Sequence, residues 1–313
     1  MLRFQASWLM ETIMDNITES SDPNWHFPCL WKFTALEWLS HLNNKFIINV
    51  PIHSQAIIFK SWFYNQNPFP DSEVMRAFNQ VLNTSIDINS NPFKDWLDIY
   101  FSKQQLAYLQ YWREASGDIR DIALKESFLS IVYQVMNYWI INNKYGFENA
   151  LTPDQIFSFY YKKYAEFREH NAKFSITEFD YDTILPENCS HVVFNLVFKD
   201  EDFIDDDSFF VYNAWLGGYT DLKESKKTII EKIKPYYFEF GNTKNFSFYK
   251  RMTEKANSAS FCWSGTGISL NLYKRFLVKP LQDVLDGTYK HSKLVYKPIN
   301  PTKKQYDFIL LFY

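Results

Sequence analysis

The chain has 313 residues and a formal net charge of −3, and it is 46% hydrophobic and 19% aromatic, which excludes a disordered protein. No stretch approaches eighteen consecutive apolar residues, and the N-terminus lacks the apolar segment of a signal peptide, so we expect no association with a membrane. The three cysteines, Cys29, Cys189 and Cys262, are too scattered for a disulfide framework or a zinc site, which favours a cytoplasmic protein.

Glycine is scarce. The chain holds 8 glycines, and none precedes Gly117. Backbone that wraps closely around a phosphate or a nucleotide needs glycine. The sequence before Gly117 therefore contains no P-loop, no dinucleotide fingerprint and no glycine-rich methyl-donor loop. The one G-x-G pattern, Gly265-Thr266-Gly267, comes late and is interpreted as a turn beside a strand.

Residues 1–170 predict a mainly helical, aromatic-rich region. The residues from Asn24 to Pro28 interrupt the helical pattern, and the run from Phe46 to Val50 predicts a short strand. Helices are expected over 8–17, 30–42, 73–82, 103–115, 128–140 and 152–170, with Ser102 and Thr152 as N-caps. The histidines His26, His41 and His53 are predicted to be surface or capping residues.

The central strand is the clearest in the chain. The run from His191 to Phe198 is almost continuously apolar, which predicts a strand buried on both faces, as in a parallel sheet. A cluster of acidic residues follows, and a helix is predicted from Ser208 to Gly218. The cluster comprises Asp200, Glu201, Asp202, Asp205, Asp206 and Asp207. It is either a solvated loop or a loop at the carboxyl end of a strand, where α/β folds place their sites.

The remaining residues alternate between helix and strand. Helices are expected over 221–234, 248–256 and 272–285, the last with a kink at Pro280, and strands over 236–240, 293–297 and 306–313. The last two strands are separated by a Pro-Ile-Asn-Pro turn and predict an antiparallel pair. We therefore expect an α/β fold, with α+β as the alternative. A helical N-terminal half would precede a Rossmann-like mixed sheet in residues 171–313.

Charge is distributed unevenly along the chain. Residues 1–219 hold 16 lysine and arginine residues against 28 aspartate and glutamate residues, whereas residues 220–313 hold 17 against 8. A basic final third suggests a face for a polyanion such as DNA or for an acidic protein partner, and ordinary solvated lysines are the alternative. The candidate phosphate-binding residues are Lys226, Lys227, Lys250, Arg251, Lys274 and Arg275.

Three segments resemble the amino-group DNA methyltransferases of mobile and defence loci, which are adenine-type enzymes. The stretch from Leu185 to Cys189 resembles their lead-in to the catalytic strand, and the stretch from Asn213 to Gly217 resembles their following helix. Residues 100–137 resemble their preceding helical segment. In the family the strand ends in Asp-Pro-Pro-Tyr, which holds the target amino group and stacks on the flipped base. Here this position reads Asn195-Leu196-Val197-Phe198, so only an amide and an aromatic residue survive.

The resemblance implies a degenerate methyltransferase-like protein without a cofactor. It would act as a nucleic-acid-binding or partner-binding subunit, in phage defence. The sequence leaves open whether the chain is an enzyme and what its oligomeric state is.

Two other functions stay open. The stretch Asp205-Asp206-Asp207 also resembles the D-x-D loop of metal-dependent glycosyltransferases, in which Asp205 and Asp207 would hold Mn²⁺ or Mg²⁺. The stretch from Phe261 to Gly267, followed by Asp283, resembles the later motifs of the β-1,3-galactosyltransferase type. The other alternative is a non-enzymatic interaction protein that assembles through its aromatic helices.

Overall fold

The computed structural model describes part of the chain, which divides into two compact units whose sequences interleave. The described residues are 8, 11–13, 15–16, 24–28, 44–63, 88–146, 151–152, 155–156, 158–159, 173–178, 189–198, 207–218, 221–233, 237–238, 246–265, 269–300, 302 and 305–313. The sheet unit comprises Met1–His53, His170–Phe203 and Lys232–Tyr313, and the helical unit comprises Ser54–Glu169 and Ile204–Glu231.

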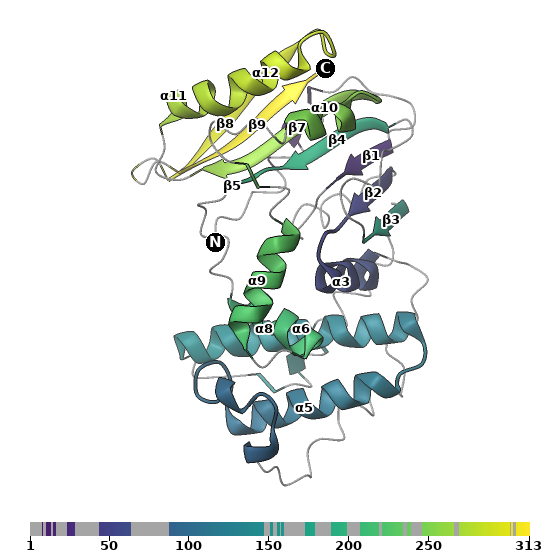
Figure 1. Ribbon diagram of the computed structural model, residues 1–313, viewed down its shortest axis with the longest axis vertical. Coiled ribbons are helices and arrows are strands. Elements are labelled where there is room, and N and C mark those ends of the chain that lie inside the picture. The colour runs from purple at the N-terminus through teal and green to yellow at the C-terminus, as the bar shows by residue number, and fades with distance from the viewer. Residues whose placement is uncertain are drawn as a thin grey trace. The chain divides into compact units, whose positions relative to one another are not determined.

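A seven-stranded mixed sheet forms the sheet unit, as the α/β prediction requires (Figure 1). Its strands are β1 (Asn24–Phe27), β2 (Lys45–Asn49), β3 (Lys173–Thr177), β4 (Cys189–Asn195), β7 (Ala256–Gly265), β8 (Ser292–Asn300) and β9 (Gln305–Phe312). Their order across the sheet is β3-β2-β1-β4-β7-β9-β8. The first five are parallel, and β9 is antiparallel to both of its neighbours. This is the doubly wound Rossmann order with the last strand inserted before the outer strand.

The sheet begins before the helical region and does not simply follow it. Strand β1 occupies Asn24–Phe27, which the sequence suggested was only a break between helices, and it pairs with both β2 and β4. Trp25, His26 and Phe27 are buried one after another, so the strand shows no alternation of exposed and buried positions. The short strand predicted near Phe46 is confirmed as β2.

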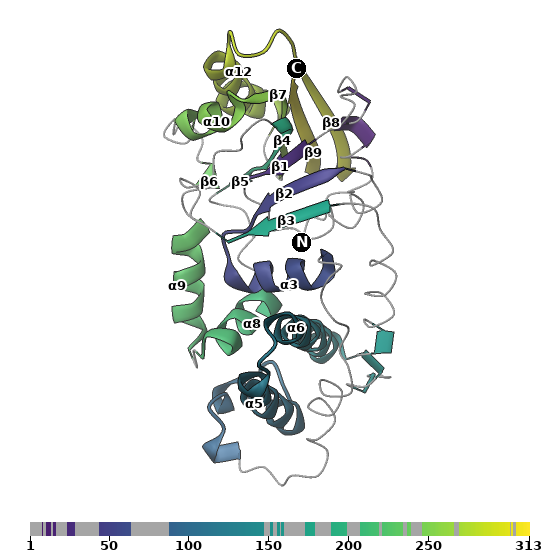
Figure 2. The ribbon, with the colours of Figure 1, turned by 90° about the vertical axis from the view of Figure 1, so that its right-hand side faces the viewer.

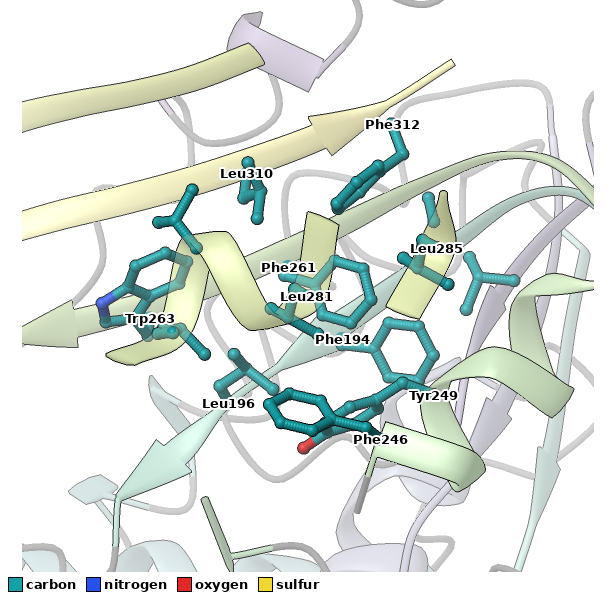
Figure 3. Close-up of a cluster of buried hydrophobic side chains, with 14 of the residues drawn as sticks. Phe194, Leu196, Phe246, Tyr249, Phe261, Trp263, Leu281, Leu285, Leu310 and Phe312 are labelled. Carbon is teal, nitrogen blue, oxygen red and sulfur yellow. The ribbon is translucent and has the colours of Figure 1, made fainter. Parts of the chain in front are cut away.

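One face of the sheet packs against helices from the last third of the chain. These are α10 (Phe246–Thr253), α11 (Leu270–Tyr273), a π-helical turn (Lys274–Val278) and α12 (Lys279–Leu285). Figure 2 shows α10 and α12 on the same side of the sheet. Figure 3 shows Phe194, Phe261 and Leu310 of three strands meeting Tyr249 of α10 and Leu281 of α12 in one buried cluster.

The end of the sheet confirms the predicted antiparallel pair, because β8 pairs with β9 over almost its whole length. The helix before it departs from the prediction in one detail. Its irregularity is the π-helical turn, which lies just before α12, whereas Pro280 sits in the first turn of α12. Because proline has no N–H to close an α-helical bond, a widened turn before it disturbs the helix little.

The helical unit is built around α5 (Lys103–Asp118), α6 (Ile122–Tyr145) and α8 (Asp207–Gly217), with α3 (His53–Phe63) and α9 (Leu222–Ile233). Trp112 of α5 stacks on Trp139 of α6 with ring centroids 5.6 Å apart. Helix α8 is tied in by two hydrogen bonds to backbone carbonyls. Tyr212 donates to Leu129 at 2.9 Å, and Trp215 donates to Leu109 at 2.8 Å.

Several predictions lie wholly or partly outside the described residues. These are the helices over 30–42 and 73–82, most of the helix over 152–170, the turn at Thr266-Gly267 and the acidic cluster as far as Asp206. Of the predicted helix over 152–170, residues 155–156 and 158–159 are described and helical. Among the described residues, every helix is too short or too polar to cross a bilayer.

Candidate functional site

The carboxyl ends of β1 and β4 mark the place where the strand order reverses. From β1 the sheet continues through β2 and β3 on one side and through β4 and β7 on the other. Doubly wound folds bind their ligands outside the carboxyl ends of the strands at such a point. The candidate site is therefore lined by Pro28 after β1, Asn49 at the end of β2 and Asn195 at the end of β4.

Asn49 links the ends of the first two strands. Its side chain is buried, and its Nδ2 atom donates a hydrogen bond of 2.9 Å to the carbonyl oxygen of Pro28. In dinucleotide-binding folds a carboxylate about 20 residues after the glycine loop accepts hydrogen bonds from the ribose. Here an amide stands at the end of β2, and it donates to the neighbouring strand.

The end of β1 also lacks what a nucleoside cofactor requires. Glycine is absent from the sequence around Pro28, so no side-chain-free backbone allows the close approach of a ligand. The residues present at the ends of β1 and β2 therefore do not fit a methyl donor.

The two residues to which the resemblance drew attention, Asn195 and Phe198, lie at the end of β4 and in the short strand that follows it. Asn195 is the last residue of β4 and is half-buried, opposite Cys262 of β7. Leu196 is buried, and its N–H donates to the carbonyl oxygen of Cys262 at 2.8 Å. Phe198 belongs to β5 (Val197–Phe198), which leaves the large sheet and pairs with β6 (Tyr237–Phe238).

A second contact lies at the same edge of the sheet. Nδ1 of His53, at the start of α3, lies 2.6 Å from Oε2 of Glu178, directly after β3. Because the two residues are 125 positions apart, sequence reasoning did not pair them. Exposed pairs of this kind contribute little to stability, so this contact orients the chain at the sheet's edge more than it holds the fold together.

Two histidines lie inside the sheet unit. His191 on β4 has its Nδ1 atom 2.7 Å from Oγ of Ser258 and its Nε2 atom 2.6 Å from Oγ of Ser260, both on β7. Burial lowers the pKa of His191 to about 3 and that of His26 to about 4. His26 was predicted to be a surface or capping residue, and that prediction is wrong because His26 is buried in β1, an interior strand. Both rings are neutral at physiological pH and serve the core.

The two described cysteines are not reactive nucleophiles. Burial raises the pKa of Cys189 to about 11, and burial together with the charge of Asp307 raises the pKa of Cys262 further. Both thiols are buried and protonated, and a thiol in that state neither attacks substrates nor binds metals.

The predicted basic residues fall into three places. Lys274 and Arg275 line an open groove of about 670 Å³. One side of the groove is the continuous helix formed by α11, the π-helical turn and α12, and the other side is the outer strand β8. Lys250 and Arg251 are exposed on α10 of the same unit. On α9, Lys226 lies 5.1 Å over the ring of Phe210.

One basic residue that lines the groove, Lys279, was not among the predicted binding residues. The lining residues of the groove are Asn271, Lys274, Arg275, Val278, Lys279, Gln282, Asp283 and Leu294, and they are called the basic groove below. Lys279 lies five residues after Lys274. At the regular α-helical period, two lysines five residues apart would point in different directions. Only the local geometry of the helix therefore shows that they line one groove.

The described residues do not test the metal-binding alternative. Asp205 lies outside the described residues, and Asp207 is the first residue of α8, with its side chain outside them. Within the described part of the chain, no three histidine, cysteine, aspartate or glutamate side chains gather as metal ligands. Binding of Mn²⁺ or Mg²⁺ at Asp205 and Asp207 stays a prediction.

No model of a known protein family matches this chain. A search of curated proteins likewise finds no match. Inferences about its function therefore rest on the strand order and on the residues at the candidate site and the basic groove.

Proposed function

We propose that this chain is a methyltransferase-like protein that has lost catalysis and serves as a nucleic-acid-binding subunit. The strand order supports this proposal. A Rossmann sheet with a final antiparallel strand between its two outer neighbours is the arrangement of the methyltransferase fold. The position of Asn195 also supports the proposal, since it is the last residue of β4, the fourth strand across that sheet.

The main observation in support of a loss of catalysis is the hydrogen bond from Asn49 to Pro28. This hydrogen bond joins the ends of β1 and β2 to each other within the chain. A functional enzyme would present a carboxylate and glycine backbone to its cofactor there. The degenerate sequence from Asn195 to Phe198 points the same way, because it lacks the prolines and the acid that hold a target amino group.

The basic residues support binding to nucleic acid. Lys250, Arg251, Lys274 and Arg275 all belong to the sheet unit, and none of them is buried. Exposed cations of this kind neutralise phosphates and release counterions from nucleic acid. The resemblance to methyltransferases of defence loci favours phage defence as the setting of such a subunit.

Two measurements test this proposal. Titration calorimetry with S-adenosylmethionine is expected to show no binding to the wild-type chain. The Asn49→Asp variant is expected to show none either, because an acid at this position does not supply the missing glycine backbone. Heat of binding at a one-to-one ratio in the wild type would overturn the loss of catalysis.

The second measurement is binding to labelled DNA across a salt series. Affinity is expected to fall as salt rises, with a slope set by the number of neutralised phosphates. A chain that binds neither duplex nor single-stranded DNA at low salt would contradict the nucleic-acid role.

A further inference from the structure

The basic groove combines three cations with one carboxylate. Lys274, Arg275 and Lys279 line its helical wall, together with the amide side chain of Asn271, and all four residues are exposed. The guanidinium of Arg275 lies 5.2 Å over the ring of Phe276, which limits its orientations. Among the described residues that line the groove, Asp283 is the only acidic one. The groove therefore favours an anionic ligand.

The π-helical turn is what brings two of the cations together. The N–H of Lys279 donates to the carbonyl oxygen of Lys274, a hydrogen bond that spans five residues. In a regular α-helix, residues five apart point about 140° away from each other. In the wider turn they lie nearly one above the other. Lys274 and Lys279 can thus approach successive phosphates from the same wall.

The opposite wall offers an aromatic surface. Leu294 of β8 lines the groove, and Tyr296 lies two residues further along the same strand, so both side chains are on the same face of the sheet. Tyr296 is 47% exposed, although its ring has neighbours 6.3 Å away in Tyr306 and 6.4 Å away in Phe308. These neighbours contact the ring edge-on and at a tilt, and they leave nearly half of Tyr296 exposed.

We infer that the basic groove binds single-stranded nucleic acid. The three cations would contact the phosphates, and Tyr296 would stack on a base. Cations that track a backbone beside an exposed aromatic ring are the pattern by which proteins hold single strands. A duplex hides the faces of its bases, so it cannot use Tyr296. This inference rests on the proposed nucleic-acid role, and it adds that the nucleic acid is single-stranded and that it binds at the basic groove.

The test is fluorescence anisotropy with a short labelled single-stranded oligonucleotide, using the full chain. Lys274→Glu combined with Lys279→Glu is expected to weaken binding at least 10-fold and to reduce the salt slope by about 1.4, at about 0.7 for each phosphate contact. Tyr296→Ala is expected to weaken binding about 10-fold without changing the salt slope, and Tyr296→Phe is expected to bind as the wild type does.

The matched control reverses the same number of charges outside the groove, in Lys255→Glu combined with Lys290→Glu, which are exposed residues of the same unit. It is expected to affect single-strand binding less than 3-fold. If the wild type binds single strands but the groove variants bind as well as it does, this inference fails and the proposed function stands. Absence of all nucleic-acid binding by the wild type overturns both. Equal affinity for duplex, or for an acidic polypeptide such as polyglutamate, also overturns the single-strand site.

Discussion

At the scale of single residues, the buried histidines make the protein sensitive to acid. His26 and His191 are neutral in the folded state, with pKa values of about 4 and about 3, whereas an unfolded histidine has a pKa near 6.5. Because the unfolded chain takes up protons first, the free energy of unfolding is highest above pH 6.5. It falls as the pH drops towards 4, by about 1.4 kcal/mol per pH unit for each histidine.

Two leucine variants separate the roles of the histidines. Within the described part of the chain, neither ring nitrogen of His26 has a hydrogen-bond partner. His26→Leu is therefore expected to keep stability at pH 7.5 and to make the fall between pH 6.5 and pH 4 shallower. His191→Leu removes one hydrogen bond from each of two buried serine hydroxyls and is expected to cost about 2 kcal/mol at pH 7.5. Urea denaturation at both pH values measures this. Equal acid sensitivity in the wild type and in His26→Leu would refute the assignment.

A second prediction concerns two glycines with positive φ. Gly218 (φ +77°) follows α8, and a Cβ atom there would collide with the guanidinium of Arg113. Arg113 is held in place because it donates to the carbonyl oxygen of Trp215 at 2.7 Å. Gly146 (φ +64°) ends α6 with open space around it. Replacement by alanine at Gly146 costs only the strain of the left-handed backbone, about 1 kcal/mol, whereas the same change at Gly218 adds the collision.

Thermal denaturation of the two alanine variants tests this comparison, with Gly146→Ala as the matched control. The expected result is a lower melting temperature for Gly218→Ala than for Gly146→Ala. Equal losses would mean that Arg113 moves aside at no cost.

At the scale of elements, α5 begins with a complete capping box. The side chain of Ser102 accepts from the N–H of Gln105, and the side chain of Gln105 accepts from the N–H of Ser102. The expected cost of Ser102→Ala is about 1 kcal/mol of unfolding free energy, whereas Ser102→Asp retains an acceptor and should lose much less. Chemical denaturation of both variants measures the difference. A loss in the aspartate variant as large as in the alanine variant would show that the cap does not stabilise α5.

The elements that sequence reasoning predicted well carry strong local signals. Helices α5 and α6 show apolar residues at helical spacing between clear caps, and β4 is a continuous apolar run. Strand β1 was not predicted, because it is short and its buried residues Trp25, His26 and Phe27 follow one another without periodicity. The π-helical turn was not predicted for a related reason, since a single widened turn leaves the composition of a helix unchanged.

At the scale of the whole molecule, the two units have separate cores, which predicts two unfolding transitions. Leu109 of α5 and Leu310 of β9 are both fully buried, one in each unit, and offer a matched pair of cavity-forming substitutions. Leu109→Ala is expected to lower the stability of the helical unit by about 2–5 kcal/mol, and Leu310→Ala that of the sheet unit by a similar amount.

Scanning calorimetry with single-strand binding as a second readout checks this prediction. Leu109→Ala should shift one transition and leave binding at the basic groove unchanged at a temperature below both transitions, because the groove belongs to the sheet unit. A single transition lowered equally by both substitutions would contradict independent cores.

The candidate site was only partly predictable. Asn195 and Phe198 were singled out by the resemblance to the methyltransferases, within the run predicted as the central strand. Lys274 and Arg275 were singled out because they are adjacent in the basic third of the chain. The contacts of Asn49 with Pro28 and of His53 with Glu178 span 21 and 125 residues and depend on strand pairing, which sequence spacing does not encode. Lys279 lines the groove because of the π-helical turn, and Tyr296 lies beside Leu294 of the groove because both belong to the outer strand β8.

The sequence by itself determined the α/β class, the capped helices, the buried central strand and the antiparallel end of the sheet, because each of these follows from local periodicity and short-range hydrogen bonding. The tertiary structure alone decided that β1 and β2 join the sheet ahead of the helical unit, and that an amide closes the ends of these strands. It also decided which cations share one groove. Those features depend on contacts between residues far apart in the chain, and such contacts form only when strand order and register are set by the burial of the whole core.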